Sequence, residues 1–369
     1  MRKLLTRLFF IFNILSALQA QQAPQYSLFL LNPYAYNPAC AGLENTLVAT
    51  GVYRQQWSSL RGAPETQHLN IHLPLFMISS GAGLKVENDI IGAHRTTQAM
   101  LSFSYQLQLG RNLQLSVGAS GGYLQYALDG AKLRAPDGLY EPAGTFLHND
   151  PLLPEGKVNA GTPAVEAGLH LQWNDLSIGL ATQPIFAPVL EDGNTGGFRL
   201  QPVQHFLGTV SYQFGVGDNL AVKPGILFKS DINITQVEIS TIIRWRENIF
   251  AGASFRGMRS SARDAFVLFG GLRLNERTTL AYSFDIPVSA LEAANRGSHE
   301  LLLRYDLNKP IGTGKLPPII YNPRFFENER TRRFCACFNC MLQPKQTRGN
   351  GCAAPETNKK NSVSHTSES

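Results

Sequence analysis

The feature that most constrains this chain is a regular alternation of apolar and polar residues over long segments. From Leu113 to Tyr123, apolar or small residues at odd positions alternate with Gln, Ser and Gly at even positions. Successive side chains of a β-strand point to opposite faces. The alternation therefore predicts strands with one face in lipid and one in a polar lumen. The same pattern recurs at 101–109, 165–174, 205–214 and 300–307.

Strands placed wherever the alternation holds number about fourteen, an even number, as expected for single-chain bacterial barrels. The predicted strands are 46–54, 66–73, 81–88, 96–109, 113–126, 164–174, 176–183, 203–215, 219–229, 233–245, 248–257, 264–274, 277–286 and 299–307.

The predicted connections are of two kinds. Tight polar turns fall at 110–112, 174–175, 215–219, 246–248 and 275–277. Longer segments fall at 55–65, 89–95, 127–163, 184–202, 258–263 and 287–298. Short periplasmic turns and long extracellular loops are typical of outer-membrane barrels, and an even strand count places both termini in the periplasm. The sequence thus predicts an all-β, transmembrane, antiparallel outer-membrane β-barrel.

The competing interpretation is a soluble β-sandwich, which also has many short strands and turns. The length of segments such as 113–126 and the two kinds of connection favour the barrel. Aromatic residues near strand ends are expected to form girdles at the membrane interfaces. They are Trp57, Tyr126, Trp173, Tyr212, Trp245 and Tyr282.

The N-terminus has the pattern of a secretory signal. Arg2 and Lys3 precede an apolar run at 4–15, and small residues lead to Ala20. We expect residues 1–20 to be a cleaved signal peptide. Residues 21–45 lack the alternation and contain two Asn-Pro steps, which favour non-strand structure; they would plug the barrel or line its periplasmic rim. The barrel is expected to span 46–308.

Residues 309–369 are rich in Pro, Lys, Asn and Ser, which predicts a largely disordered periplasmic tail. Cys40 stands alone, whereas Cys335, Cys337, Cys340 and Cys352 crowd this tail. Two interpretations stay open for the tail cysteines: weak metal ligands, or local disulfides or free thiols, which an exported chain favours. The net charge of +6 is weighted towards the tail, which argues against nucleic-acid binding.

No catalytic motif is recognisable in the sequence. A Gly-x-Ser-x-Gly elbow, a His-Glu-x-x-His zinc motif and a phosphate-binding loop are all missing, so we expect a non-enzyme without a cofactor. His68 and His72 share one strand face, where solvation is the ordinary state and metal binding the alternative. Charged residues on the polar faces would either line an ion-selective pore or pair to close the lumen. They are Glu166, His170, Glu238, Arg244, Arg256, Asp285, Arg304 and Asp306.

The segment after the signal sequence is specific enough to suggest a family. The chain reads Gln-Tyr from position 25 and carries Asn32-Pro33, then Asn37-Pro38 and Gly42. This resembles the opening of the PorP/SprF family. The resemblance covers roughly 22–326, and the tail beyond it departs from the family pattern. Further matching positions are Arg54, Trp57, Gly62, Pro64, Asn88, Asp89, Gly92, His299, Glu300, Pro323, Arg324, Phe325 and Phe326.

The resemblance implies a non-enzymatic component of the type IX secretion and gliding apparatus of Bacteroidota. Such a barrel would bind periplasmic ring or anchoring proteins, or a large secreted surface adhesin. The matching residues would contact partners or stabilise loops. The alternative is an outer-membrane porin or small-solute transporter.

Overall fold

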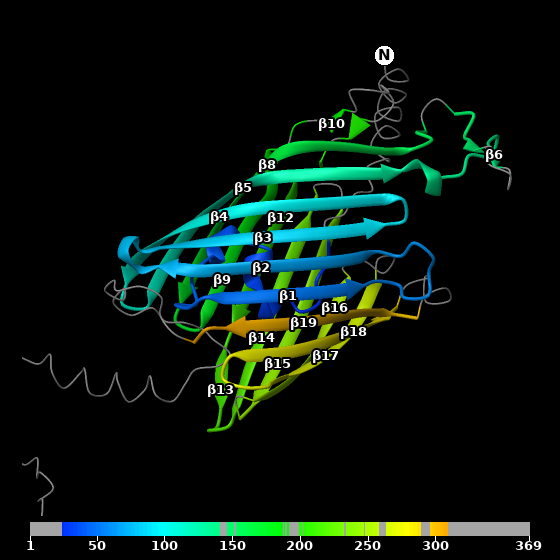
Figure 1. Ribbon diagram of the computed structural model, residues 1–369. Coiled ribbons are helices and arrows are strands. Elements are labelled where there is room, and N and C mark those ends of the chain that lie inside the picture. The colour runs from blue at the N-terminus through cyan, green and yellow to red at the C-terminus, as the bar shows by residue number, and fades with distance from the viewer. Residues whose placement is uncertain are drawn as a thin grey trace, which may run out of the picture. The chain divides into compact units, whose positions relative to one another are not determined.

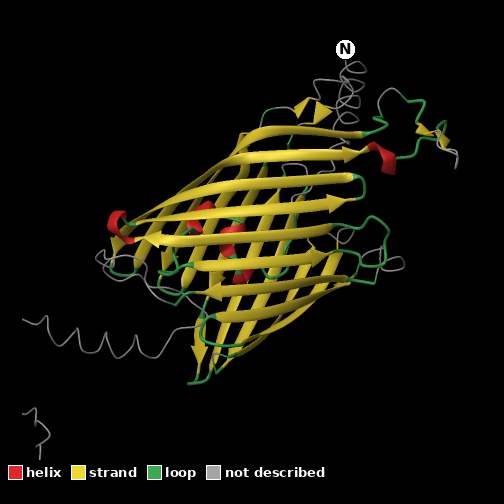
Figure 2. Ribbon diagram, viewed as in Figure 1, coloured by secondary structure: helices red, strands yellow, loops and turns green. Residues whose placement is uncertain are grey.

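The computed structural model describes residues 24–308, except 141–145, 151–152, 187, 189, 192–198, 201, 232–233, 247, 258–262 and 289–295. These residues form a closed, antiparallel barrel of fourteen strands (Figures 1 and 2). The expected signal peptide, the tail with its cysteines, and Pro323 to Phe326 lie outside the described residues.

The wall consists of β1 (Val48–Gln55), β2 (Glu65–Leu75), β3 (Ser80–Ile91), β4 (His94–Gly110), β5 (Leu113–Asp129), β8 (Lys157–Trp173), β9 (Leu176–Phe186), β12 (His205–Tyr212), β14 (Leu220–Ser230), β15 (Thr235–Trp245), β16 (Ile249–Gly257), β17 (Arg263–Arg273), β18 (Thr278–Pro287) and β19 (Ser298–Asp306). β13 (Phe214–Val216) continues β12 along β14. Two small hairpins stand apart from the wall: β6 (Leu139–Tyr140) with β7 (Phe146–Leu147), and β10 (Leu190–Glu191) with β11 (Arg199–Leu200).

Each wall strand pairs with its neighbours in sequence, and β1 pairs with β19 to close the barrel. The closing register aligns Val48 with Asp306 and Gln55 with His299. Just below it, the Leu307 amide donates to the Leu47 carbonyl at 2.9 Å. Since every wall strand pairs with another strand on each side, the closed wall has no edge strand.

All fourteen predicted strands are present, but two predicted long connections are wrong. Segment 89–95 is not a loop, because β3 and β4 continue until Ile91 pairs with His94. Gly92, with a φ of +61°, makes the tight turn that L residues resist. The excursion 127–163 is shortened, because β5 and β8 pair as far as Asp129 and Lys157.

The two faces of the wall differ as the alternation predicts. On β4, Leu101 is 68% exposed on the outside, whereas Ser104 is fully buried on the inside. The lipid-facing surface is therefore apolar and the lumenal surface polar. Tyr126 is a correction to the expected girdle, because its even position turns it into the lumen beside Leu124. Trp173 and Trp245 do point outward, with 57% and 49% exposure.

The barrel has two distinct ends. The short-turn rim carries the tight connections, such as 111–112 and 174–175, together with Leu47 and Leu307. The long-loop rim carries the connections between β1 and β2, β5 and β8, β9 and β12, and β18 and β19. Among the described residues, no helix is long and apolar enough to span a membrane.

Candidate functional site

The lumen holds the chain's own N-terminal segment. Residues 24–45, here called the lumenal segment, lie inside the ring of strands (dark blue in Figure 1). They form three short 3-10 helices, η1 (Phe29–Leu31), η2 (Pro33–Ala35) and η3 (Pro38–Cys40). Most of the segment is buried, including Tyr34 at 1% and Ala39 at 0% exposure.

The Asn-Pro steps explain why this segment folds into short turns. Proline occupies the first position of η2 and η3, where a missing N–H costs nothing. Asn37 caps η3, since its Oδ1 accepts from the Ala39 amide at 2.9 Å. Its Nδ2 donates to the carbonyls of Leu169 and Leu180 at 2.9 and 3.3 Å. One side chain thus caps the start of η3 and attaches it to β8 and β9.

Small residues on the lumenal face make room for η3 and the residues after it. A Cβ placed on Gly118 would lie 2.4 Å from the Ala39 backbone nitrogen, and one on Gly81 would lie 2.1 Å from the Ala41 carbonyl oxygen. Ser116 and Ser104 donate to the carbonyls of Ala39 and Ala41, each at 2.7 Å. The backbone of the lumenal segment therefore lies directly against the wall at these positions, and larger wall residues there would prevent this contact.

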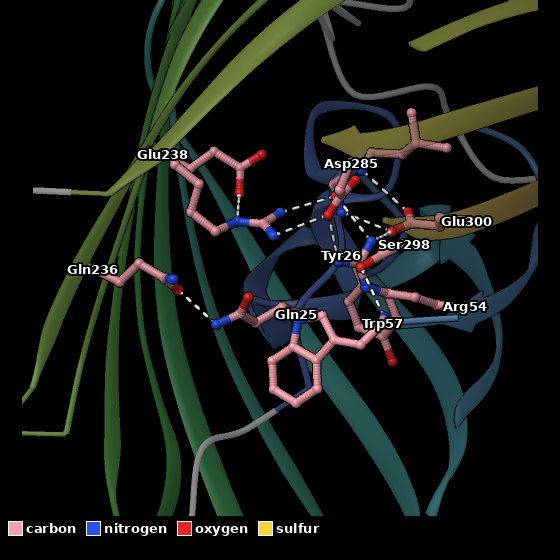
Figure 3. Close-up of polar contacts among 12 residues, drawn as sticks. Gln25, Tyr26, Arg54, Trp57, Gln236, Glu238, Asp285, Ser298 and Glu300 are labelled. Atoms are coloured by element: carbon pink, nitrogen blue, oxygen red, sulfur yellow. Dashed lines mark hydrogen bonds and ion pairs between the residues drawn. The ribbon is translucent and has the colours of Figure 1, made fainter. Parts of the chain in front are cut away.

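A buried charge cluster holds the start of the segment towards the long-loop rim. Arg54 on β1 lies 2.6 Å from the Asp285 carboxylate and 2.9 Å from that of Glu300 (Figure 3). The Glu300 carboxylate also accepts the backbone amides of Ser27 and Leu28, at 2.7 and 3.1 Å. Three wall strands thus supply the charged side chains of this cluster, and the lumenal segment adds backbone hydrogen bonds to one of them.

A second arginine closes this cluster. Arg256 lies 2.8 Å from Glu238 and 3.2 Å from Asp285, and it donates to Ser27 Oγ at 2.9 Å. We call these groups the charge clasp: Ser27, Arg54, Glu238, Arg256, Asp285 and Glu300. Buried ion pairs add little net stability over apolar packing, but removing one partner leaves an uncompensated charge. The clasp therefore specifies where the segment lies.

A chain of hydrogen bonds ties the segment to β2 and β3 as well. Tyr26 donates its hydroxyl to Glu87, whose carboxylate also lies 3.1 Å from His68 Nδ1. Asn70 contacts His68 Nε2 and donates to Asn32 Oδ1, each at 2.9 Å. The lumenal segment thus contacts the lumen-facing side chains of both β2 and β3.

The two histidines considered as metal ligands have separate partners. His72 Nδ1 accepts from the Gly42 amide at 3.2 Å, whereas His68 contacts Glu87 and Asn70. Within the described part of the chain, no group of three or more His, Cys, Asp or Glu residues could hold a metal ion.

Cys40 is buried in the segment, and desolvation raises the pKa of its thiol to about 12. It is therefore protonated at neutral pH. It lies in an apolar cluster with Tyr34 and Ala41. The role of this cysteine in the structure is packing.

Several residues that match the family pattern lie at the long-loop rim, where they join neighbouring loops. The Gly92 amide donates to the Gly62 carbonyl at 2.9 Å, and the Gln56 amide to the Pro64 carbonyl at 2.9 Å. Gly62 has a φ of +75°, and Trp57 a φ of +48°. These contacts stabilise the β1–β2 connection against the β3–β4 turn.

Three further residues that match the family pattern lie on strands. Asn88 accepts from Arg95 at 2.6 Å, and His299 lies 2.7 Å from the Tyr282 hydroxyl. Asp89 faces the lumen, where it accepts from Thr66 at 2.6 Å. The structure thus brings Asn32, Asn37, Gly42, Arg54 and Glu300 together at the lumenal segment, which also contains Pro33 and Pro38. Asp89 faces the lumen as well, whereas the other described positions lie at the rim or on the outer wall: Trp57, Gly62, Pro64, Asn88, Gly92 and His299.

A cavity of about 440 Å³ lies between the lumenal segment and the long-loop rim. Tyr26, Ala35 and Tyr36 belong to the lumenal segment and line it on one side. The wall lines the rest of the cavity with apolar residues, among them Leu124, Ala164 and Leu207, and with polar residues, among them Asp89, His205 and Lys229. Lys229 donates to the Pro24 carbonyl at 3.3 Å, which places the start of the segment beside this cavity.

Sequence reasoning missed Ser27, Asn70 and Glu87 as members of the site. Their signal is weak, because a polar residue at an inward position of any barrel strand looks the same in the sequence. Ser27, which lies outside the strands, carries no local pattern at all.

Comparisons with solved structures return outer-membrane barrels. A Ralstonia pickettii toluene transporter, TbuX, has 11% identity and a TM-score of 0.43, covering 73% of this chain and 91% of its own. The CymD monoaromatic hydrocarbon channel has 11% identity and a TM-score of 0.41, covering 75% and 91%. A KdgM porin has 9% identity and a TM-score of 0.34, covering 70% and 98%. No curated protein sequence matches the chain.

The family comparison is more specific than these structural ones. The model of the type IX secretion system membrane protein PorP/SprF matches residues 18–305, which include the lumenal segment and all of the wall except its last residue, Asp306. The fold agrees with an outer-membrane location, and the resemblance noted in the first residues is confirmed over most of the chain. This chain belongs to the PorP/SprF family of type IX secretion system membrane proteins.

Proposed function

We propose that this protein is a non-catalytic docking barrel of the type IX secretion and gliding apparatus, not a diffusion pore. The observation that carries the proposal is the lumenal segment. It contacts strands from most of the wall, including β1, β5, β9 and β16. A lumen filled in this way suits a barrel whose rims hold other proteins.

The two rims suggest how partners are arranged. Short turns usually face the periplasm and long loops the cell surface. In this orientation the short-turn rim and the chain after Asn308 would meet periplasmic ring or anchoring proteins. The long-loop rim would meet a secreted surface adhesin. The resembling residues inside the lumen would act indirectly, by keeping the barrel closed and its loops in place.

The charged lumen supports the same interpretation. Arg54 pairs with Asp285 and Glu300, Lys85 with Glu166 at 2.6 Å, and Arg256 with Glu238. Paired charges neutralise each other, whereas ion selectivity needs a ring of unbalanced charge along an open path.

The proposal is tested by affinity purification of the tagged protein from detergent-solubilised outer membranes, followed by mass spectrometry. We expect periplasmic secretion-ring proteins or a large surface adhesin to co-purify. Recovery of the barrel alone, under conditions where it remains folded on a gel, would contradict the proposal.

A truncated variant locates the contact. Deletion of residues 327–369, which lie outside the described residues, should leave the heat-modifiable folded band intact. Loss of periplasmic proteins from this variant, with adhesin retained, would assign those contacts to the tail.

A further inference from the structure

One strand of the wall continues beyond its neighbour at the long-loop rim. β8 pairs with β5 along its whole length, from Lys157 to Trp173. On its other side, β8 pairs with β9 only from Val165 to Trp173. Residues 157–164 therefore form an edge without ladder partners on the β9 side, among the residues that the structure describes. We call these eight residues the β8 edge.

The β8 edge is long enough for another strand. At about 3.3 Å per residue, eight residues extend roughly 26 Å, more than a typical strand of five or six residues needs. The β10–β11 hairpin lies close to β8 (Figure 1) but forms a separate two-stranded sheet. The edge thus presents backbone donors and acceptors that a further strand would satisfy.

The inner face beside the edge is apolar, unlike the lumen below it. Ala164 of the edge packs with Leu124 and Met100, and Tyr126 lies against this cluster. Ala164, Leu124 and Tyr126 also line the cavity of about 440 Å³. A cavity with apolar walls and a few polar groups is typical of a binding site. Since Ala164 is the last residue of the edge and also lines the cavity, the edge and the cavity are continuous.

We propose that the β8 edge and this cavity together form a docking site for an extended segment of a partner polypeptide. The segment adds a strand to β8, and its inward side chains, which are apolar, enter the cavity beside Leu124 and Ala164. Strand addition supplies affinity through main-chain hydrogen bonds, while the pocket supplies specificity. The inference rests on the proposed docking function and names the residues at which a partner binds.

Two residues limit which strands are accepted. Pro163 has no N–H to donate, and Lys157 places an exposed charge at the end of the edge. Both features are known to discourage indiscriminate edge pairing. A partner must compensate with side chains that fit the cavity, so binding is selective.

The test is photo-crosslinking in cells, in the full-length tagged protein. p-Benzoyl-phenylalanine replaces Lys157 or Asn159, which are both exposed and two residues apart on the edge. The matched control carries it at Arg95 on β4, which is exposed and level with Asn159, because both residues pair with Ala127 of β5. We expect crosslinks from both edge positions, and not from Arg95, to a protein that also co-purifies with the barrel. The two crosslinked positions on that partner should be two residues apart, as strand pairing requires.

Other results would overturn the inference. Crosslinks only to residues 187–204 of the same chain would show that the protein covers its own edge, and crosslinks to a second copy would indicate self-association. Absence of edge crosslinks while a partner still co-purifies would refute this site and leave the docking function intact. Recovery of the barrel without any partner would instead refute the docking function.

A pair of substitutions tests the cavity. Ala164→Phe fills the cavity, whereas Ala167→Phe adds the same ring on the opposite, lipid-facing side of the same strand. We expect Ala164→Phe to lower the edge crosslink yield about tenfold, with the folded band unchanged, and Ala167→Phe to leave the yield unchanged. Equal yields from both variants would refute a role for the cavity.

Discussion

The backbone amide of Ser27 donates to the carboxylate of Glu300 at 2.7 Å, across 273 residues of sequence. Glu300 belongs to the last strand, and Ser27 precedes the first. This hydrogen bond ties the lumenal segment to the strand that closes the wall against β1. The position of the lumenal segment and the closure of the barrel therefore depend on the same residue, Glu300.

The charge clasp should be sensitive to loss of a single partner. We expect Arg54→Met to destabilise the barrel by about 3–5 kcal/mol, because Asp285 and Glu300 would remain buried without their cation. Urea unfolding in liposomes measures this change. The control Arg95→Met removes an exposed arginine that contacts Asn88, and should cost less than about 1 kcal/mol. Similar losses in the two variants would argue against the clasp.

Glycines under η3 should be intolerant of side chains. Gly118→Val would force a side chain into the Ala39 backbone, and we expect it to cost at least about 1–3 kcal/mol or to displace the segment. Gly121→Val is the matched control on the same strand, because a Cβ there meets nothing within 4 Å. The temperature at which the folded gel band disappears reports the difference. An unchanged temperature for Gly118→Val would contradict the close contact.

Much of the wall could be predicted from the sequence, because the cause of the pattern is local. Phe103 faces lipid and Ser104 faces the lumen, so the two environments are recorded in adjacent residues. The alternation carries less information at the rim, where both strand faces meet water. The sequence therefore predicts a loop at 89–95, although Gly92 only turns the chain.

The lumenal site could not be predicted in the same way. Its contacts join residues far apart in the sequence, such as Tyr26 with Glu87 and Asn37 with Leu169. Neither the Asn-Pro steps nor the alternation of the strands indicates which strand faces which turn. The inward orientation of Tyr126 follows from its even position, but its aromatic character suggested the membrane interface instead.

The cap of η3 provides an isosteric test. Asn37→Asp keeps the acceptor for the Ala39 amide but replaces the donor that serves Leu169 and Leu180 with a second acceptor. We expect a loss of about 1–3 kcal/mol, because two carbonyls would face an unpaired carboxylate. The same change in the exposed turn, Asn112→Asp, should be nearly neutral. Calorimetry of the two variants distinguishes these outcomes, and equal melting would contradict the role of Asn37.

Cys40 reports whether the segment stays in the lumen. In a variant whose tail cysteines are serine, we expect a maleimide to leave Cys40 unlabelled in the folded barrel and to label it after heating. An ordinary thiol titrates near pH 8.5 and labels faster at pH 9 than at pH 7. Because burial raises the pKa of Cys40 to about 12, almost none of this thiol is ionised at either pH, so the folded protein should label slowly at both.

A control establishes that the reagent has access. Asn112→Cys, in a background with Cys40→Ser, places a thiol in an exposed turn and should label at once at both pH values. Rapid labelling of Cys40 without heating would show that the segment leaves the lumen or moves within it.

The central claim, that the protein's own N-terminal segment closes the lumen, is tested most directly by conductance. The purified full-length barrel is inserted into planar lipid bilayers, with Gly118→Val as the variant expected to displace the segment, because its side chain would collide with the Ala39 backbone. We expect the wild-type protein to show no steady conductance and the variant to show stable open steps. A steady, ohmic current through the wild-type barrel would contradict the account and favour a porin.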